Sequence, residues 1–134
     1  ETLRYSYSKM INGIRKNLFT QKTALAAYER MAEYLAKDLL GKGYFASLLL
    51  SMISIESVYL DTQIQATCKE IYEDWQRLYA DHLAGFGFGP EESVITAQAV
   101  FALIHGSMVS SWIKQDPTDL MLAKVSLRQL IGDR

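Results

Sequence analysis

The side chains best suited to chemistry in this sequence are Glu56, Cys68, His82 and His105. Glu56 lies in an apolar segment, where a carboxylate needs a polar partner or ligand, and with His105 it could form the acid–base pair of an enzyme. Cys68 and the two histidines could bind a metal, but they are not closely spaced and a structural site needs four ligands. We therefore expect hydrogen-bonded imidazoles and a partly buried thiol, with no catalytic residue, metal or cofactor.

Sequence motifs of the common enzyme classes are missing from the chain, which contains no G-x-S-x-G, H-E-x-x-H or C-x-x-C pattern. The glycine-rich stretch "GFGFG" (85–89) lacks the Lys-Ser/Thr pair of a phosphate-binding loop. It also lacks the preceding strand of a dinucleotide-binding motif. We interpret this stretch as a turn between two helices.

Length and composition favour a single globular domain over residues 1–134. Apolar residues make up 49% and charged residues 22% of the chain, and the net charge is −1, which argues against both disorder and a polybasic nucleic-acid binder. The lone Cys68 can form no internal disulfide and no signal peptide is apparent, so we expect a cytoplasmic protein. Because the chain begins with Glu1 inside a helical pattern, we also expect it to be part of a longer protein.

The elements that position these side chains are predicted to be helices. Apolar residues recur at steps of three and four, and glycines and prolines fall mainly between the periodic segments. Thr20, Asp61 and Asp116 are suitable N-caps, while Gly41 and Gly85 are suitable helix terminators. No segment alternates like a strand, so the predicted fold class is all-α. The six predicted helices cover residues 2–18, 20–40, 44–60, 61–84, 90–114 and 117–131.

The fifth predicted helix carries no charged residue between Ser93 and Ile113, a length that could cross a membrane. Its His, Gln, Gly and Ser residues instead favour a helix that is buried on both sides in protein. A helical wheel places its larger side chains on one face, which could line a ligand cavity or form ordinary core. That face holds Val94, Gln98, Phe101, His105, Met108 and Trp112. The opposite face, which would let another helix approach closely, holds Ala99, Leu103, Gly106, Ser107 and Ser110.

The order and wording of the segments resemble a known family. The matching features are a Gly before an apolar helix with "SIES", then "IYEDWQRLYADHLAG", "PEES", "FALIHGSMVSSWIKQDPTDL" and "AKVSLRQLIG". Through them the C-terminal two-thirds of the chain resembles the ligand-binding and dimerisation domain of TetR-type transcriptional repressors, most closely the LmrA/YxaF-like branch. The first two helices resemble those that follow the DNA-binding headpiece in that family. This chain has "GYFAS" where that branch often has Cys after Gly, and it lacks the family's N-terminal helix-turn-helix.

The resemblance implies a six-helix effector domain that dimerises through a four-helix bundle of its last two helices. It also implies a cavity for a small hydrophobic or aromatic effector, whose binding shifts the linking helix 2–18 and relieves DNA binding. DNA would be bound only through the missing headpiece, and no membrane is implied. The expected ligand-binding residues, chosen by face and chemistry, are Met52, Glu56, Trp75, Phe101, His105, Met108 and Trp112. The expected dimer-interface residues are Ala99, Leu103, Gly106, Ser107, Ser110, Leu120, Ala123, Leu127, Leu130 and Ile131.

Two functions of other classes stay open. The chain could be a homodimeric helical adaptor that binds no small molecule, in which case its interior would contain no cavity. It could also be an acid–base enzyme, in which case its activity would depend on pH and would require both Glu56 and His105.

Overall fold

In the computed structural model, the described residues are 2–40 and 62–134. They form five helices and no strand, so the prediction of an all-α fold is confirmed for this part of the chain. The predicted helix over 44–60 lies outside the described residues. The five helices are α1 (Thr2–Leu18), α2 (Ala24–Leu40), α4 (Thr62–Ala84), α5 (Pro90–Lys114) and α6 (Thr118–Ile131).

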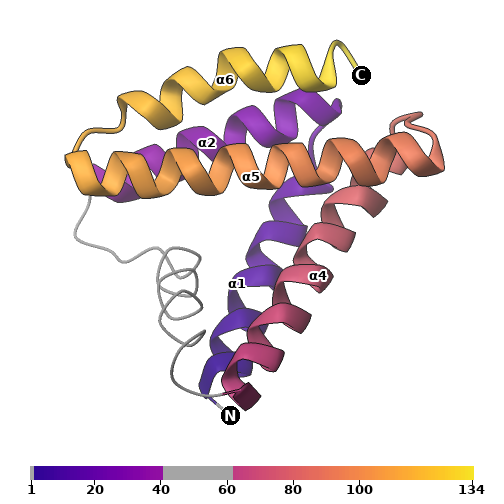
Figure 1. Ribbon diagram of the computed structural model, residues 1–134. Coiled ribbons are helices and arrows are strands. Elements are labelled where there is room, and N and C mark those ends of the chain that lie inside the picture. The colour runs from indigo at the N-terminus through magenta and orange to yellow at the C-terminus, as the bar shows by residue number, and fades with distance from the viewer. Residues whose placement is uncertain (1, 41–61) are drawn as a thin grey trace.

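The helices are arranged in a layer and an inclined pair (Figure 1). α2, α5 and α6 pack against one another and form the layer, while α1 and α4 run alongside each other at a steep angle to it. α4 also packs along α5, and α1 contacts α2. α4 and α5 therefore connect the inclined pair to the layer.

Two helix starts differ from the prediction, and local hydrogen bonds explain both. α2 begins after Thr23, whose hydroxyl oxygen lies 3.1 Å from the backbone N–H of Ala26 and caps the first turn. The prediction of Thr20 as the cap was wrong, because its hydroxyl instead donates to the carbonyl of Asn17 at 3.0 Å. α6 begins at Thr118, one residue later than predicted, and Asp116 accepts the Thr118 N–H at 2.9 Å.

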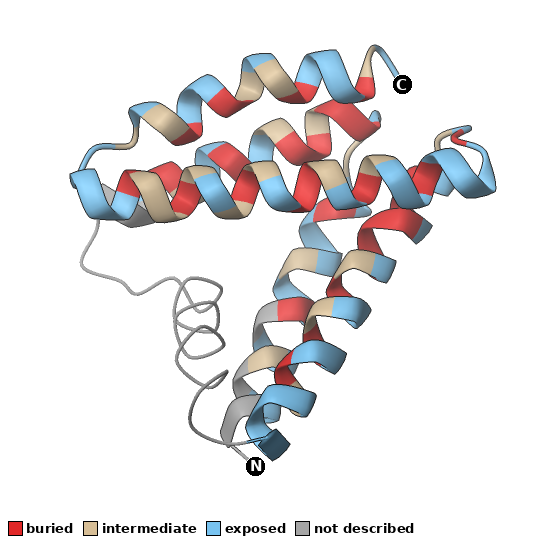
Figure 2. Ribbon diagram, viewed as in Figure 1, coloured by how far each residue is buried: buried red, intermediate tan, exposed pale blue. Residues whose placement is uncertain are grey.

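The main core lies where α1, α2, α4, α5 and α6 meet, and each helix turns its buried stripe toward that junction (Figure 2). Trp75, Tyr28 and Tyr79 are the largest fully buried side chains. Burial of such rings contributes strongly to stability because each removes a large apolar area from water. Helical spacing also predicts one buried stripe on α4, made of Ile64, Cys68, Ile71, Trp75, Leu78 and His82. Its members from Cys68 onward are buried, whereas Ile64, in the first turn, is 40% exposed.

Among the described helices, α4 and α6 cover one side of α5, and the prediction that protein buries both of its sides stays a prediction. The buried residues of α5 face α4 and α6, whereas Ala102, Gly106 and Ile113 are exposed. Among the described helices, α5 is long and apolar enough to cross a membrane, a criterion that the core helix of a soluble protein also meets. The exposed side of α5 is therefore an apolar surface that no other helix in 2–40 or 62–134 covers.

Candidate functional site

Four rings from α4 and α5 form an aromatic cluster, which we define as Tyr72, Trp75, Phe101 and His105. Tyr72 and Trp75 are three residues apart on α4, and Phe101 and His105 four apart on α5, so each pair shares one helix face. The Phe101 and His105 rings are stacked with centroids 4.0 Å apart. Trp75 meets them edge-on, at 5.1 Å from Phe101 and 4.6 Å from His105. Tyr72 lies 5.4 Å from Phe101.

A groove of about 670 Å³ opens beside this cluster. Its walls are mainly apolar, and three rings of the cluster form its floor together with the outward residues of α5. A volume of this size falls in the range of sites for small organic molecules, which are mostly apolar with a few polar groups. The lining residues are Tyr72, Phe101, Ala102, His105, Gly106, Val109, Ser110, Ile113 and Lys114.

His105 is a half-buried polar member of the cluster. Its Nδ1 lies 3.0 Å from the carbonyl oxygen of Phe101, one turn earlier on α5. Because a carbonyl can only accept, Nδ1 carries the proton and donates, which leaves Nε2 as an acceptor. Burial lowers the pKa of this imidazole to about 4, although its bond to Phe101 opposes the shift. His105 is therefore neutral near pH 7 and has one fixed tautomer.

The Nε2 atom of His105 is enclosed, and no described residue hydrogen-bonds to it. The indole nitrogen of Trp75 is likewise buried without a partner of hydrogen-bonding geometry among the described residues, although the Tyr79 hydroxyl comes near it. A buried polar atom without a partner costs about 1 to 3 kcal/mol. The aromatic cluster thus contains a hydrogen-bond acceptor, His105 Nε2, to which no described residue donates.

The structure brings together three of the predicted ligand-binding residues, Trp75, Phe101 and His105. Met108 lies deeper, in a second small core with Ala36 and Leu120. Trp112 lies in the last turn of α5 and is 38% exposed. The predicted residues Met52 and Glu56 lie outside the described residues.

Sequence reasoning missed Tyr72 as a member of the cluster. The predicted stripe of α4 contained Trp75, and Tyr72 is one turn before it on the same side of the helix. That spacing was the available signal. Its partly buried ring lies 5.9 Å from the ring of His105 and lines the groove.

The predicted interface residues fall into two groups. Those of α5 are accessible in part: Gly106 is exposed, while Ala99, Leu103, Ser107 and Ser110 are half-buried. On α6, by contrast, only Leu130 keeps substantial exposure, at 39%. The other α6 candidates are buried in the chain's own core, where α6 packs against α2 and α5, so they have no surface to offer a partner. These buried residues are Leu120, Ala123, Leu127 and Ile131.

An apolar stripe instead follows the side of α5 that faces away from α4, and we call it the outward stripe; its member Val109 also packs against the second small core. Its members recur at alternating steps of four and three, the spacing of a helix seam in a coiled coil. They are Ile95, Ala99, Ala102, Gly106, Val109 and Ile113. Apart from its two chain neighbours and the backbone of its own helix, nothing lies within 4 Å of the position that a Cβ would take on Gly106. Neighbouring α6 exposes Met121, Leu122 and Val125.

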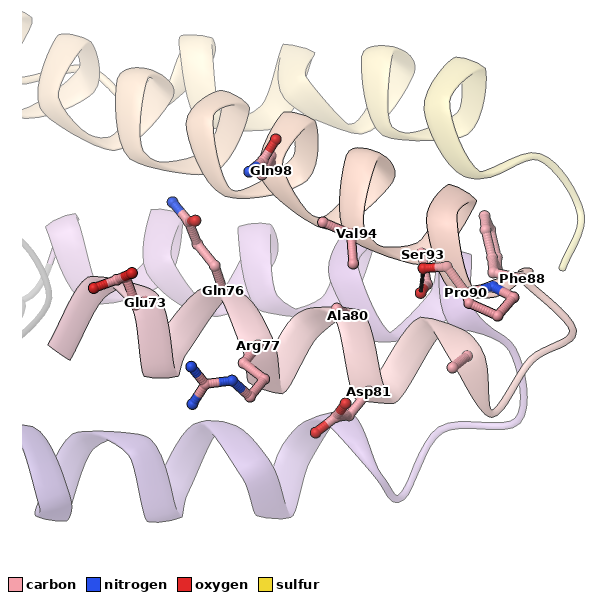
Figure 3. A pocket seen from close by; sticks show the side chains of 11 residues that line it. Glu73, Gln76, Arg77, Ala80, Asp81, Phe88, Pro90, Ser93, Val94 and Gln98 are labelled. Carbon is pink, nitrogen blue, oxygen red and sulfur yellow. Dashed lines mark hydrogen bonds between the residues drawn. The ribbon is translucent and has the colours of Figure 1, made fainter. Parts of the chain in front are cut away.

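A second groove, of about 530 Å³, lies between α4 and the first turns of α5 (Figure 3). It differs from the first in carrying Glu73, Arg77 and Asp81 along its α4 wall. Arg77 forms an exposed ion pair with Asp74 at 2.8 Å, so its charge is already balanced in water. These solvated charges make the second groove less suited to an apolar ligand than the first.

His82, in the last turn of α4, joins three helices. Its Nε2 lies 3.0 Å from the carbonyl oxygen of Leu18, and its Nδ1 lies 3.0 Å from the hydroxyl of Tyr28. The carbonyl can only accept, so Nε2 donates to Leu18 and Nδ1 accepts from Tyr28. Burial lowers the pKa of this imidazole, and the bond to Leu18 partly opposes that shift. A neutral His82 thus ties the end of α1 to α2 and α4.

The chemistry available to the histidines is limited. His105 is a weak acid–base group near neutral pH, because its pKa lies well below 7. In residues 2–40 and 62–134, no three His, Cys, Asp or Glu side chains gather around a point where they could hold a metal ion. The geometry of the cluster fits binding of an apolar molecule better than catalysis.

Comparison with known proteins gives one finding. Residues 24–125 match the family model described as transcriptional regulator LmrA/YxaF-like, C-terminal domain. The matched range contains the whole aromatic cluster, the outward stripe and the exposed residues Met121, Leu122 and Val125 of α6. No curated protein matches the chain.

Proposed function

Since this chain belongs to the family of LmrA/YxaF-like C-terminal domains of TetR-type transcriptional regulators, we propose that residues 1–134 are one domain that binds a small hydrophobic or aromatic effector. The domain forms a homodimer, and effector binding relieves DNA binding by a headpiece that precedes α1 in the parent protein. Domains of this family are parts of transcription regulators and are generally not enzymes. A regulator of this kind works in the cytoplasm, where its operator DNA lies.

The observation that carries the proposal is the groove of about 670 Å³ lined by Tyr72, Phe101 and His105. Aromatic rings offer flat faces and edges to an aromatic guest and lose little conformational freedom when they bind it. The enclosed acceptor of His105 adds one polar group to otherwise apolar walls. That combination is typical of a small-molecule site.

The proposed mechanism follows the contacts of α4. This helix carries Tyr72 and Trp75 at the groove, and further along it carries His82, which bonds to Leu18 at the end of α1. An effector that moves α4 relative to α5 therefore also moves α1, the helix that would lead to the headpiece. The effector can shift the DNA-binding equilibrium only by its difference in affinity for the two arrangements.

We propose a dimer interface formed by the outward stripe of α5 together with Met121, Leu122 and Val125 of α6, because these α6 residues are exposed whereas most of those expected from the sequence are buried. A two-fold axis would pair each stripe with its own copy and cover both apolar surfaces at once. Gly106 and Ala102 would let the two α5 backbones approach closely. The stripe also shares Ala102, Gly106, Val109 and Ile113 with the groove, so a partner subunit would close the groove on its open side.

The test is a combined measurement of assembly and binding on the 134-residue chain. We expect sedimentation at tens of micromolar to show a dimer, and a panel of apolar aromatic compounds to contain members that raise the unfolding temperature. A dimer that no compound stabilises would support the adaptor instead. A monomer that no compound stabilises would contradict both.

A further inference from the structure

We propose that His105 Nε2 is the hydrogen-bond acceptor by which this domain selects aromatic effectors that carry an N–H or O–H donor, an inference that rests on the proposed function. Two facts about the imidazole carry it. Nδ1 is committed to the Phe101 carbonyl at 3.0 Å, which fixes the tautomer. Nε2 then presents a lone pair for which the described residues supply no donor.

The surroundings of the imidazole define the shape of the donor-bearing molecule. Trp75 and Phe101 hold the ring from two directions, at 4.6 and 4.0 Å between centroids. Tyr72 approaches to 5.9 Å from the side of the groove. A guest that reaches Nε2 is thus surrounded by π-faces and edges, which favour a flat aromatic ring.

The sign of the selection follows from the protonation state. Burial keeps the imidazole neutral near pH 7, so Nε2 is an acceptor and cannot donate to a carbonyl or an ether oxygen of a guest. A guest with a donor forms a hydrogen bond in a site shielded from water, whereas a guest without one leaves the lone pair unmet. A site built around a buried polar group discriminates in this way against analogues that lack the matching group.

The enclosure of Nε2 makes this recognition selective for one arrangement of the helices. Less than 1 Å² of the atom is exposed, so a guest reaches it only if the groups that cover it move aside. The hydrogen bond then exists only in the shifted arrangement. This gives the effector a difference in affinity between two states, which an effector needs in order to act.

The experiment compares indole with benzothiophene, two bicyclic molecules of similar shape, of which only indole carries an N–H donor. Their dissociation constants are measured by ligand-observed NMR with the unmodified chain and with His105→Phe, which keeps a flat ring and removes the acceptor. We expect the ratio of the two constants to change by about tenfold, in the direction of lost indole binding, because one buried hydrogen bond is removed. Phe101→Leu is the control, since it shrinks the wall and should weaken both probes alike.

A second measurement needs no variant. With ¹⁵N-labelled histidine, indole should move the Nε2 resonance of His105 toward the value of a hydrogen-bonded nitrogen, and benzothiophene should not. The inference is overturned if the ratio of constants is the same in His105→Phe, or if both probes move the resonance equally. If neither probe binds the unmodified chain, the aromatic site and the proposed function fail together. Binding of both probes without preference removes the role of His105 and leaves the proposed function standing.

Discussion

The Nε2 atom of His82 lies 3.0 Å from the carbonyl oxygen of Leu18, the last residue of α1. Through this bond, a buried side chain from the last turn of α4 caps the C-terminal end of α1. On its other side the same ring accepts a hydrogen bond from Tyr28 of α2. The position of the C-terminal end of α1 therefore depends on the position of α4, and this dependence can be tested.

Replacing His82 by Phe should destabilise the chain by about 2 to 4 kcal/mol. The buried Leu18 carbonyl loses its donor, and the Tyr28 hydroxyl keeps only the long bond to the Tyr79 carbonyl at 3.5 Å. Urea denaturation followed by circular dichroism would measure the loss. Tyr28→Phe in the same background should recover part of it. Tyr34→Phe is the matched control, since Tyr34 is exposed and its change should have little effect. A His82→Phe chain as stable as the unmodified one would show that this junction contributes little.

Stability should fall as the pH is lowered from about 6.5 to about 4, as expected for a buried histidine with a depressed pKa. In this range His105 is protonated in the unfolded chain but stays neutral in the folded chain, because its pKa in the folded chain is about 4. The contribution of neutral His105 to the free energy of unfolding is fully present above pH 6.5 and is lost as the pH falls to about 4. For a pKa shift of this size the loss is up to about 3 kcal/mol. Urea denaturation at several pH values measures the slope. His105→Phe should reduce the slope and leave the part due to His82, whose pKa burial also lowers. A slope unchanged in that variant would contradict the assignment.

The outward stripe should control assembly. Ile113→Glu or Gly106→Leu is expected to shift the dimer to monomer, because charge or bulk enters the proposed seam, while the fold persists. Ile113 is 72% exposed in the chain, so a change there should not disturb the core. Val94→Glu, also exposed on α5 but off the stripe, serves as the control. Sedimentation velocity distinguishes the outcomes. If both stripe variants dimerise with unchanged affinity, the stripe is not part of the interface.

Leu127→Glu should behave differently from the stripe variants. Leu127 has no exposed surface and packs in the core shared by α2 and α6. A carboxylate there would be buried without a partner, so the variant should unfold and not simply dissociate. Circular dichroism would show loss of helix. If the Leu127→Glu chain were instead folded and monomeric, Leu127 would be an interface residue, as the sequence predicts.

The 134-residue chain should not bind operator DNA selectively. Its net charge is −1, and phosphate contacts from Lys and Arg supply most of the affinity in DNA complexes. A mobility-shift assay at physiological salt is the measurement. Sequence-selective binding by this chain would mean that DNA recognition does not require the proposed headpiece.

α5 and α6 show how much of the fold and of the candidate site could be predicted from the sequence. Periodicity placed Phe101 and His105 together on α5 and Trp75 on the buried stripe of α4, because residues at helical steps share a face in any helix. It also grouped Leu120, Ala123 and Leu127 correctly on one side of α6. What it could not provide was the identity of the element that covers that side. An apolar stripe that packs on α2 of the same chain has the same spacing as one that packs on a second copy.

The helix starts show a similar limit. Thr20 and Thr23 are equally good caps by residue type, and only the path of the turn after α1 decides between them. In the structure the Thr20 hydroxyl turns back to Asn17, and Thr23 is left to cap α2. The choice depends on where α2 must lie to pack against α6, which is a tertiary constraint.

The residues shared by the groove and the outward stripe restrict how proteins of this kind can diverge. A substitution at Gly106 or Val109 that suits a new effector also alters the surface that a second subunit would meet. A gene duplicate that acquires a different ligand preference through these positions would at the same time lose its fit to the original subunit. Two such paralogues in one cell would sort into separate homodimers without any additional device.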